Sequence, residues 1–402
     1  MIFTQGKTEC TPSEVGYNGE RLDVLNKHLQ SGIDAGEIQC ATYCLSRKGK
    51  VFAHAAVGKK SFREKDDSPA LPDSLRRIAS VTKTFVAVAI MKLVEDGLAR
   101  IDQPVGEILP QFNTPPYNGI NLFQLLTHTS GLHADPGCFV NKYQTSYWDM
   151  IEKAMKLHDK DKLHEFDWIS AALGTIGTGM RVAPNSEWAY CSFGFEILGA
   201  IIEKLSGIHA HKYITDNICA PLGMSDTAFD DGITPEMAKR HIITDEETEK
   251  VMQNKINGIQ EPHDPYDWDN FNIPHTGGGL TSTARDLVTF GNMVLHKGTF
   301  GGTRILGRKA VEKMTEPCVS APDNCWGAGG GIHKYAIGFD HRNGTQFTFS
   351  DSTVMHEGAG ACALYVDFDE DMVAAWIVPL ARDDWFPRIQ YNTQTVIWSG
   401  II

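Results

Sequence analysis

The sequence predicts an α+β protein, an α/β sandwich in which helices flank an antiparallel sheet built from both chain ends. Three observations support this fold class: strand-like segments occur only near the two ends, the middle is helical, and the first helix precedes a hairpin instead of a βαβ unit. We expect a single unit over residues 1–402. Residues 1–78 and 276–402 would form its α/β subdomain, and residues 79–275 an inserted, mainly helical subdomain with loops.

The N-terminal part predicts one helix and two strands. Apolar residues recur every three or four positions over Gly19–Ala35, which indicates an amphipathic helix, and Gly36 marks its end. The segments Cys40–Ser46 and Lys50–Val57 are typical of strands, and Lys48-Gly49 predicts the turn between them. A helix would therefore pack on a two-stranded hairpin.

The middle of the chain predicts several helices. Phe85–Val94 is apolar almost all round, so we expect a buried central helix there. Shorter helices are expected at Asn121–Thr127, Tyr147–Leu157 and Phe193–Leu205. The polar stretch Asp245–His275 has little periodicity and predicts a long loop bordering the site.

Strand character returns near the C-terminus. Strands are expected at Gln346–Asp351, Ala361–Asp367 and Met372–Pro379, followed by a closing helix at Phe386–Trp398. These strands would join the N-terminal hairpin in one sheet.

Composition excludes two classes of protein. The 37 Lys and Arg residues against 50 Asp and Glu residues give a formal net charge of −13, without a basic block, which argues against nucleic-acid binding. The longest apolar runs, Phe85–Met91 and Val373–Leu380, are shorter than the roughly 20 residues that span a bilayer. The N-terminus has neither the basic nor the apolar region of a signal peptide, so we expect a cytoplasmic protein without a membrane partner.

The cysteines and histidines do not indicate a metal or cofactor site. The nine cysteines are scattered without a Cys-x-x-Cys pair, which predicts reduced thiols. His209 and His211 are two residues apart, but no cysteine or carboxylate cluster accompanies them at ligand spacing. We therefore expect neither a metal nor a cofactor.

The sequence contains a Ser-x-x-Lys motif, Ser80-Val81-Thr82-Lys83, at the start of the predicted buried helix. Residues at i and i+3 share a helix face, so the Ser80 hydroxyl and the Lys83 amine can lie within hydrogen-bonding reach. The helix N-terminus offers N–H groups to an oxyanion. Burial lowers the pKa of a lysine, and a neutral amine can accept the serine proton. Alternatively, Ser80 caps the helix and Lys83 extends into solvent.

A second candidate segment is Tyr190-Cys191-Ser192, which precedes an apolar helix. Tyr190 is a candidate proton shuttle between nucleophile and leaving group, and Ser192 is a candidate hydrogen-bond partner of the substrate. Cys191 has no evident base partner and is expected to be a packed thiol. The alternative for Tyr190 is that it only packs in the core.

A third candidate segment is His356-Glu357-Gly358-Ala359-Gly360. Small residues such as Gly358 let a substrate lie against a strand edge. The N–H groups of Ala359 and Ser80 would then form an oxyanion hole. The alternative for His356 is an ordinary surface histidine.

Together these segments resemble the serine β-lactamase and penicillin-binding-protein superfamily, in particular the class C β-lactamases with their esterase and D-aminopeptidase relatives. In that resemblance Tyr190-Cys191-Ser192 is the second motif, and His356-Glu357-Gly358 is a variant of Lys-Thr-Gly. Three further stretches are similar to the family: LFQLLTHTSGL at 122–132, ICAPLGMSDTAF at 218–229 and GGGLTSTARDLVTFGNMVL at 277–295. The resemblance implies a β-lactamase/transpeptidase-like fold.

The resemblance also implies a serine hydrolase that works through an acyl-enzyme on a small-molecule acyl substrate. The substrate would be a small ester, an amide or a D-amino-acid compound, with weak β-lactam binding or hydrolysis. Efficient β-lactam turnover is disfavoured because His356 replaces a lysine that holds the β-lactam carboxylate in such relatives. Two alternatives stay open: a β-lactamase or D,D-peptidase proper, and a non-catalytic penicillin-binding-like sensor. An α/β-hydrolase is disfavoured because the Gly-x-Ser-x-Gly elbow is absent. The sequence does not predict the oligomeric state.

Overall fold

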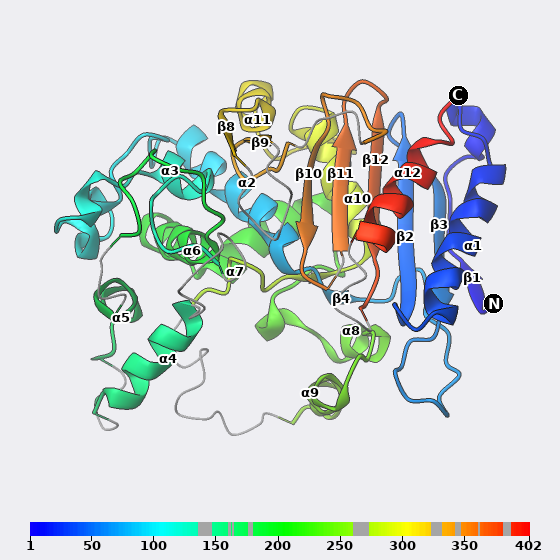
Figure 1. Ribbon diagram of the computed structural model, residues 1–402, viewed down its shortest axis with the longest axis horizontal. Coiled ribbons are helices and arrows are strands. Elements are labelled where there is room, and N and C mark those ends of the chain that lie inside the picture. Colours follow the sequence, from blue (N-terminus) through cyan, green and yellow to red (C-terminus); the bar gives the residue numbers. More distant parts are fainter. Residues whose placement is uncertain are drawn as a thin grey trace.

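The computed structural model is centred on a six-stranded antiparallel sheet with the order β1-β3-β2-β12-β11-β10 (Figure 1). It describes residues 1–135, 147–159, 162, 165–175, 180–259, 273–322, 332–341, 347–360, 362–380 and 387–402. The strands are β1 (Phe3–Gln5), β2 (Cys40–Arg47), β3 (Lys50–Gly58), β10 (Val354–Gly358), β11 (Cys362–Asp367) and β12 (Met372–Ile377). The pairing of β2 with β12 joins the two chain ends, so the predicted fold class is confirmed.

Helices cover both faces of the sheet (Figure 1). Along β2, Tyr43 and Leu45 point to the core shared with α1 (Glu20–Asp34) and α12 (Asn392–Trp398). Cys40 and Cys44 point to the opposite core. This alternation is the two-residue period of a strand buried on both faces. Helix α10 (Ala284–Leu295) packs on that opposite face, against β2, β11 and β12.

The predicted buried helix is confirmed as α2 (Thr82–Glu95). It lies between the sheet-bearing half and the helical half, where α6 (Ser192–Ser206) packs against it (Figure 1). The Phe85 ring stacks on Phe290 of α10 with a centroid separation of 3.9 Å. Contact with neighbours on several sides explains why the helix is apolar almost all round.

The remaining α-helices of the described residues are α3 (Leu122–Leu126), α4 (Tyr147–Leu157), α5 (Trp168–Thr175), α7 (Ala210–Ile214), α8 (Pro235–Arg240), α9 (Glu246–Asn257) and α11 (Arg308–Thr315). Short strand pairs are β4 (Arg76–Arg77) with β5 (Thr281–Ser282), β6 (Thr299–Phe300) with β7 (Thr303–Arg304), and β8 (Val319–Pro322) with β9 (Ile332–Tyr335). The subdomain boundaries at residues 78 and 276 stay a prediction.

Local signals explain several confirmed elements. The predicted turn Lys48-Gly49 joins β2 and β3, with φ of 53° and 73° at its two residues. Positive φ at both positions matches the twist of a tight hairpin. The predicted closing helix consists of a π-helical turn, Pro387–Tyr391, followed by α12; its predicted first residue, Phe386, lies outside the described residues.

Two predictions were wrong. The strand expected at Gln346–Asp351 is absent over the described residues 347–351, and the sheet edge is instead β10, which carries His356. The Phe347 and Phe349 rings of this segment stack on each other with a centroid separation of 5.0 Å. The loop expected at Asp245–His275 instead begins with helix α9, whose N-terminus is capped by the Asp245 carboxylate accepting the Thr248 N–H; residues 260–272 of that prediction lie outside the described residues.

No helix in the described part of the chain is both long enough and apolar enough to cross a membrane.

Candidate active site

Ser80 lies in a short 3-10 turn, Ala79–Val81, immediately before α2. Ala79 has a φ of 44°, in the left-handed region that residues with a Cβ rarely adopt. Ser80 is partly exposed, whereas Lys83 one turn later is completely buried. The alternative that Lys83 extends into solvent is therefore wrong.

Lys83 contacts three oxygen atoms. Its Nζ lies 3.1 Å from Ser80 Oγ, 2.9 Å from Ser192 Oγ and 2.6 Å from the Gly277 carbonyl oxygen. Burial lowers the pKa of Lys83 to about 8, although the negative charges of Asp135 and Glu196 raise it in part. A substantial share of the molecules then holds a neutral amine at slightly alkaline pH.

Asp135 determines the direction of the hydrogen bond between Lys83 and Ser192. The Ser192 hydroxyl donates to Asp135 Oδ2 at 2.6 Å, and the Ser192 amide donates to Oδ1 at 2.7 Å. Because the Ser192 proton is directed at the carboxylate, its oxygen accepts from Lys83. Asp135 thus links the start of α6 to the amine of α2.

Glu196 supports the third contact of Lys83. This buried residue accepts the Gly277 amide N–H at 3.1 Å through Oε1, and its Oε2 lies 3.4 Å from Thr276 Oγ1. An added Cβ at Gly277 would lie 2.6 Å from Glu196 Oε1, so a side chain there would displace the carboxylate. Glu196 therefore fixes the carbonyl that Lys83 binds.

Tyr190 completes the group around Ser80. Its hydroxyl hydrogen-bonds with the Ser80 side chain, and its ring centroid lies 4.8 Å from Lys83 Nζ. Burial, and then the negative charge of Asp135, raises the pKa of Tyr190 well above its usual value. The phenol is therefore protonated at neutral pH and can donate its proton.

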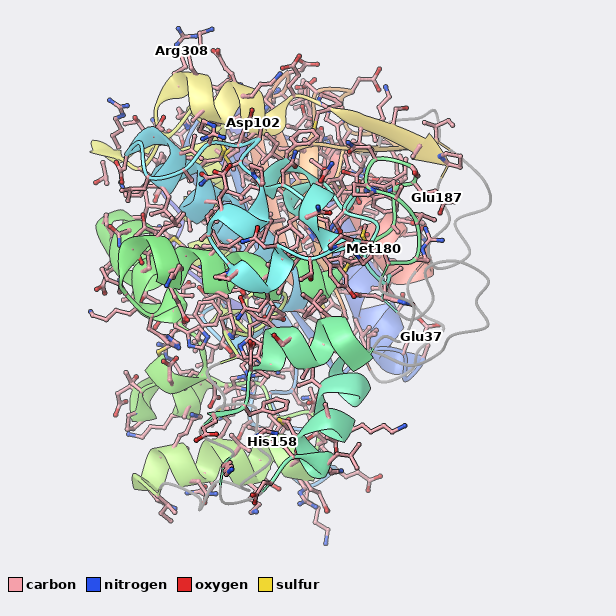
Figure 2. All side chains as sticks on the ribbon, turned by 90° about the vertical axis from the view of Figure 1, so that its left-hand side faces the viewer. Glu37, Asp102, His158, Met180, Glu187 and Arg308 are labelled. Atoms are coloured by element: carbon pink, nitrogen blue, oxygen red, sulfur yellow. The ribbon has the colours of Figure 1, made fainter. Side chains whose placement is uncertain are left out.

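His128 holds the backbone on both sides of Tyr190. Its carbonyl accepts the Ala189 N–H at 2.9 Å, and its Nδ1 accepts the Cys191 N–H at 3.1 Å. The ring packs on Tyr190 with a centroid separation of 4.3 Å. Tyr190 is thus held in place by His128, which follows helix α3 and is distant in the sequence. The segment leading to it, which includes Met180 and Glu187, lies on the helical side of the molecule (Figure 2).

A chain of hydrogen bonds connects His128 to His356 through Tyr335. The Tyr335 hydroxyl lies 3.2 Å from His128 Nε2 and 3.3 Å from His356 Nε2. His128 Nδ1 accepts from a backbone amide, so its Nε2 carries the proton and donates to Tyr335. His356 Nδ1 faces the Glu357 carbonyl at 2.8 Å and must donate. When this ring is neutral, its Nε2 accepts from Tyr335, and the chain is satisfied with a neutral ring at both histidines.

The third predicted segment passes close to the Ser80 turn. Gly358 ends β10, and a Cβ added there would lie only 2.3 Å from the Ile78 carbonyl oxygen. Only glycine permits this approach of two backbones. The next residue, Ala359, is exposed in the turn after β10. The oxyanion hole formed by the amides of Ser80 and Ala359 stays a prediction.

The structure brings Ser80, Lys83, Tyr190 and Ser192 into one contact group, and it links His356 to Tyr190 through ring packing at 6.2 Å. Sequence reasoning missed Asp135, Glu196, His128, Tyr335 and Gly277 as members of this site. His128 and Gly277 lie in two of the family-like stretches, which was the available signal. Asp135 and Tyr335 had none, because single polar residues acquire a role only through their distant partners.

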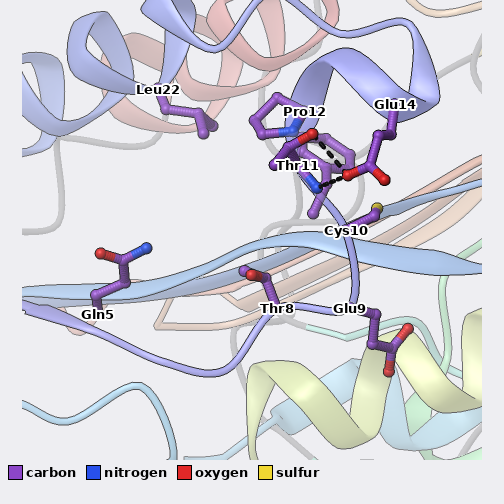
Figure 3. A pocket seen from close by; sticks show the side chains of 9 residues that line it. Gln5, Thr8, Glu9, Cys10, Thr11, Pro12, Glu14 and Leu22 are labelled. Carbon is purple, nitrogen blue, oxygen red and sulfur yellow. Dashed lines mark hydrogen bonds between the residues drawn. The ribbon is translucent and has the colours of Figure 1, made fainter.

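Cys191 is buried, and burial raises the pKa of its thiol to about 12, so it does not provide a thiolate at neutral pH. A hollow of about 410 Å³ lies away from these residues, at the N-terminal segment (Figure 3). Gln5, Glu9, Cys10 and Phe52 are among its lining residues. None of the predicted site residues lines it.

Comparisons with known proteins identify the family of this chain. A family model described as Beta-lactamase matches residues 25–382. Esterase EstB of Burkholderia gladioli is 30% identical over 199 residues, which cover 47% of this chain and 46% of EstB. Penicillin-binding protein 4* of Bacillus subtilis (strain 168) is 31% identical over 214 residues, which cover 52% of this chain and 43% of that protein. These two alignments therefore span less than half of each relative.

Among solved structures, the octameric penicillin-binding protein homologue from Pyrococcus abyssi superimposes with a TM-score of 0.65 at 22% sequence identity. The superposition covers 92% of this chain and 76% of that chain. At this identity the match shows a common fold.

Proposed function

Because this chain belongs to the beta-lactamase family, we propose that it is a serine hydrolase that forms an acyl-enzyme on a small, uncharged ester or amide. Ser80 is the nucleophile, Lys83 is the general base, and Tyr190 carries the proton to the leaving group. The esterase among its relatives supports this reaction class.

The observation that carries the proposal is the set of contacts around Lys83 Nζ. Ser192 Oγ and the Gly277 carbonyl both require a hydrogen from the amine, because the first is donating to Asp135 and the second has no proton. A neutral amine has two hydrogens for these partners. Its lone pair is then left for the third contact, the Ser80 hydroxyl at 3.1 Å. This orientation is the one required of a general base.

In the acylation step, Ser80 Oγ forms a bond to the substrate carbonyl carbon while its proton passes to Lys83 Nζ. The amides of Ser80 and Ala359 would stabilise the oxyanion. As the tetrahedral intermediate collapses, the bond to the leaving group breaks and the Tyr190 phenol protonates that group. The Lys83 ammonium then returns its proton directly to the Tyr190 phenolate; both side chains contact Ser80 Oγ, so they lie side by side.

In the deacylation step, a water molecule bonds to the acyl carbon and gives up a proton to the Lys83–Tyr190 pair. The bond to Ser80 Oγ breaks, and the same pair returns a proton to the serine. The products are the free acid and the original enzyme, so protons balance over the cycle.

The hydrogen-bond chain through Tyr335 supports an uncharged substrate. In the resemblance to the family, His356 takes the place of the lysine in Lys-Thr-Gly; its Nδ1 donates to a carbonyl, and Nε2 of the neutral ring accepts from Tyr335. In that form the ring brings no positive charge to the end of β10. A substrate carboxylate would then gain no charged partner from this ring, whereas a neutral ester would not need one.

A substrate panel tests the proposal. The panel comprises a p-nitrophenyl acyl ester, a D-alanyl anilide and a chromogenic cephalosporin, each assayed with wild type and Ser80→Ala. We expect turnover of the ester that is lost in Ser80→Ala, and an acyl adduct on Ser80 detected by peptide mass spectrometry. Ser31→Ala is the matched control, because Ser31 is an exposed serine of α1, on the far face of the sheet.

The remaining outcomes separate the alternatives. Cephalosporin hydrolysis faster than ester hydrolysis would favour a β-lactamase proper, and preferred cleavage of D-alanyl substrates would favour a D-amino-acid-directed peptidase. Stable acylation of Ser80 without turnover would favour a sensor. Absence of both turnover and adduct on every substrate would refute the hydrolase.

A further inference from the structure

Two histidines that the sequence left without partners acquire carboxylates in the folded chain. His209 immediately precedes α7 and His211 lies in it, while Asp231 belongs to a 3-10 turn, Asp230–Gly232, twenty residues further on. One nitrogen or oxygen atom of each of these three residues lies within 4.8 Å of the others. A further carboxylate, Glu203 near the end of α6, accepts the Ala210 N–H through Oε1, and this oxygen lies 3.3 Å from His209 Nε2. We propose that these residues form a structural Zn²⁺ site.

His211 is oriented as a metal ligand. Its Nε2 lies 2.6 Å from the Pro274 carbonyl oxygen, and its ring stacks on Phe229 with a centroid separation of 3.9 Å and an interplanar angle of 6°. Metal-binding histidines characteristically donate their second N–H to a carbonyl or carboxylate, which fixes the tautomer and the ring direction. This arrangement directs Nδ1 of His211 to Asp231.

The contact between His211 and Asp231 requires a cation. Because a carbonyl oxygen only accepts, Nε2 must carry the hydrogen, and Nδ1 of the neutral ring then presents a lone pair. Asp231 Oδ1 is 3.0 Å from Nδ1 and also presents a lone pair. Two acceptors at this distance are stabilised by a proton or by a metal ion between them.

The second histidine favours a metal ion over a proton. A proton on Nδ1 would join His211 and Asp231 alone, whereas a metal ion could also bind the nitrogen of His209 that lies within 4.8 Å of both. Two imidazole nitrogens and one or two carboxylate oxygens are a donor set of zinc. In a tetrahedral zinc site neighbouring ligand atoms lie about 3.4 Å apart, given bonds of about 2.0–2.1 Å. The exposed side chains of His209 and Asp231 need to move only about an ångström to reach that spacing.

The site has a connection to the Ser80 region through the backbone. Pro274, which His211 binds, lies three residues before Gly277, whose carbonyl accepts from Lys83. Within the described part of the chain, His209, His211 and Asp231 form no hydrogen bond with Ser80 or Lys83, so the ion would stabilise the fold and take no part in the chemistry. The proposal therefore does not depend on the hydrolase assignment.

The test is direct metal binding by the untagged full chain after dialysis against a chelator. Zn²⁺ is titrated by calorimetry, Co²⁺ by its visible absorption, and thermal unfolding is followed with and without Zn²⁺. The informative variant is His211→Gln, because the glutamine amide can still donate to Pro274 from near the Nε2 position but offers no ligand at Nδ1. His158→Gln, a histidine of the α4 region, and Cys318→Ser, an exposed thiol, are the controls.

We expect one Zn²⁺ per chain, a Tm that rises with Zn²⁺, and an affinity at least about tenfold lower in His211→Gln with both controls unchanged. Tetrahedral Co²⁺ absorption that His211→Gln abolishes would support the same ligand set. Binding that is equal in His211→Gln, binding lost in Cys318→Ser, or the absence of stoichiometric binding by wild type would overturn the proposal. The last result would mean that a proton alone joins His211 and Asp231.

Discussion

Replacing Asp135 by asparagine tests the proposed role of Lys83 most directly. Ser192 Oγ lies between the two groups, 2.9 Å from Lys83 Nζ and 2.6 Å from Asp135 Oδ2. The carboxylate oxygen is therefore at most 5.5 Å from the amine. At that separation a unit charge stabilises the protonated amine by about 3 kcal/mol for an effective dielectric constant of 20. This energy corresponds to about two pH units in the titration of the amine.

The sign follows from the charge. Asp135 favours the ammonium form and opposes the effect of burial, which is what lowers the pKa of Lys83 to about 8. In Asp135→Asn the amine loses its proton at lower pH. We therefore expect the acidic limb of kcat/KM for the p-nitrophenyl ester, which reports the free enzyme, to move down by about one to two pH units.

A matched control is available in the same chain. Asp167 accepts from the amide and hydroxyl of Ser170, at 3.1 and 2.7 Å, as Asp135 does from Ser192, but its other side-chain partner is the Gln111 amide and not a lysine. Asp167→Asn should leave the limb unchanged. An acidic limb that stays in place or moves up in Asp135→Asn would refute the assignment of that limb to Lys83.

Three further variants test the site. Gly358→Ala places a Cβ 2.3 Å from the Ile78 carbonyl, so we expect a loss of about 1–3 kcal/mol in urea unfolding and a strong loss of ester turnover. His128 has its pKa held well below the usual value, chiefly by burial, so the folded state requires the neutral ring. The stability that depends on this neutral ring is present above about pH 6.5 and is lost as the pH falls. His128→Asn keeps an acceptor for the Cys191 amide but does not titrate, so the free energy of unfolding should depend less on pH in the acid range. Tyr335→Phe removes both hydrogen bonds of its hydroxyl and should cost about 1–3 kcal/mol, with carboxylate-bearing substrates gaining on neutral esters at pH 6.

Each of these variants has an outcome that contradicts the reasoning. Wild-type stability of Gly358→Ala would mean that β10 does not press on the Ser80 turn. An unchanged acid dependence in His128→Asn would assign the loss to another buried histidine, such as His241, whose pKa is lowered to about 4. An unaltered substrate preference in Tyr335→Phe would separate His356 from specificity.

The predicted elements failed where the local pattern and the packing disagree. Helix α9 buries little apolar surface, with Met252 as its buried residue, so it has no apolar period. Its caps were present in the sequence, because Asp245 begins it and Gly258, at a φ of 66°, ends it. Strand β10 carries polar and small residues because it borders the site, so no strand pattern indicated it.

The sequence by itself determined the sheet-and-helix architecture and the Ser80–Lys83 pair, because both depend on short-range periodicity: alternation along strands, and a spacing of three along one helix. The tertiary structure alone decided which residues act on that pair. Asp135, Gly277 and Tyr335 come from segments far apart in the chain, and their hydrogen bonds fix where the amine of Lys83 points and which partner His356 Nε2 has. The same holds for Asp231 beside His211. Protonation and ligand geometry depend on distances of a few ångströms, which folding sets between residues that sequence spacing does not relate.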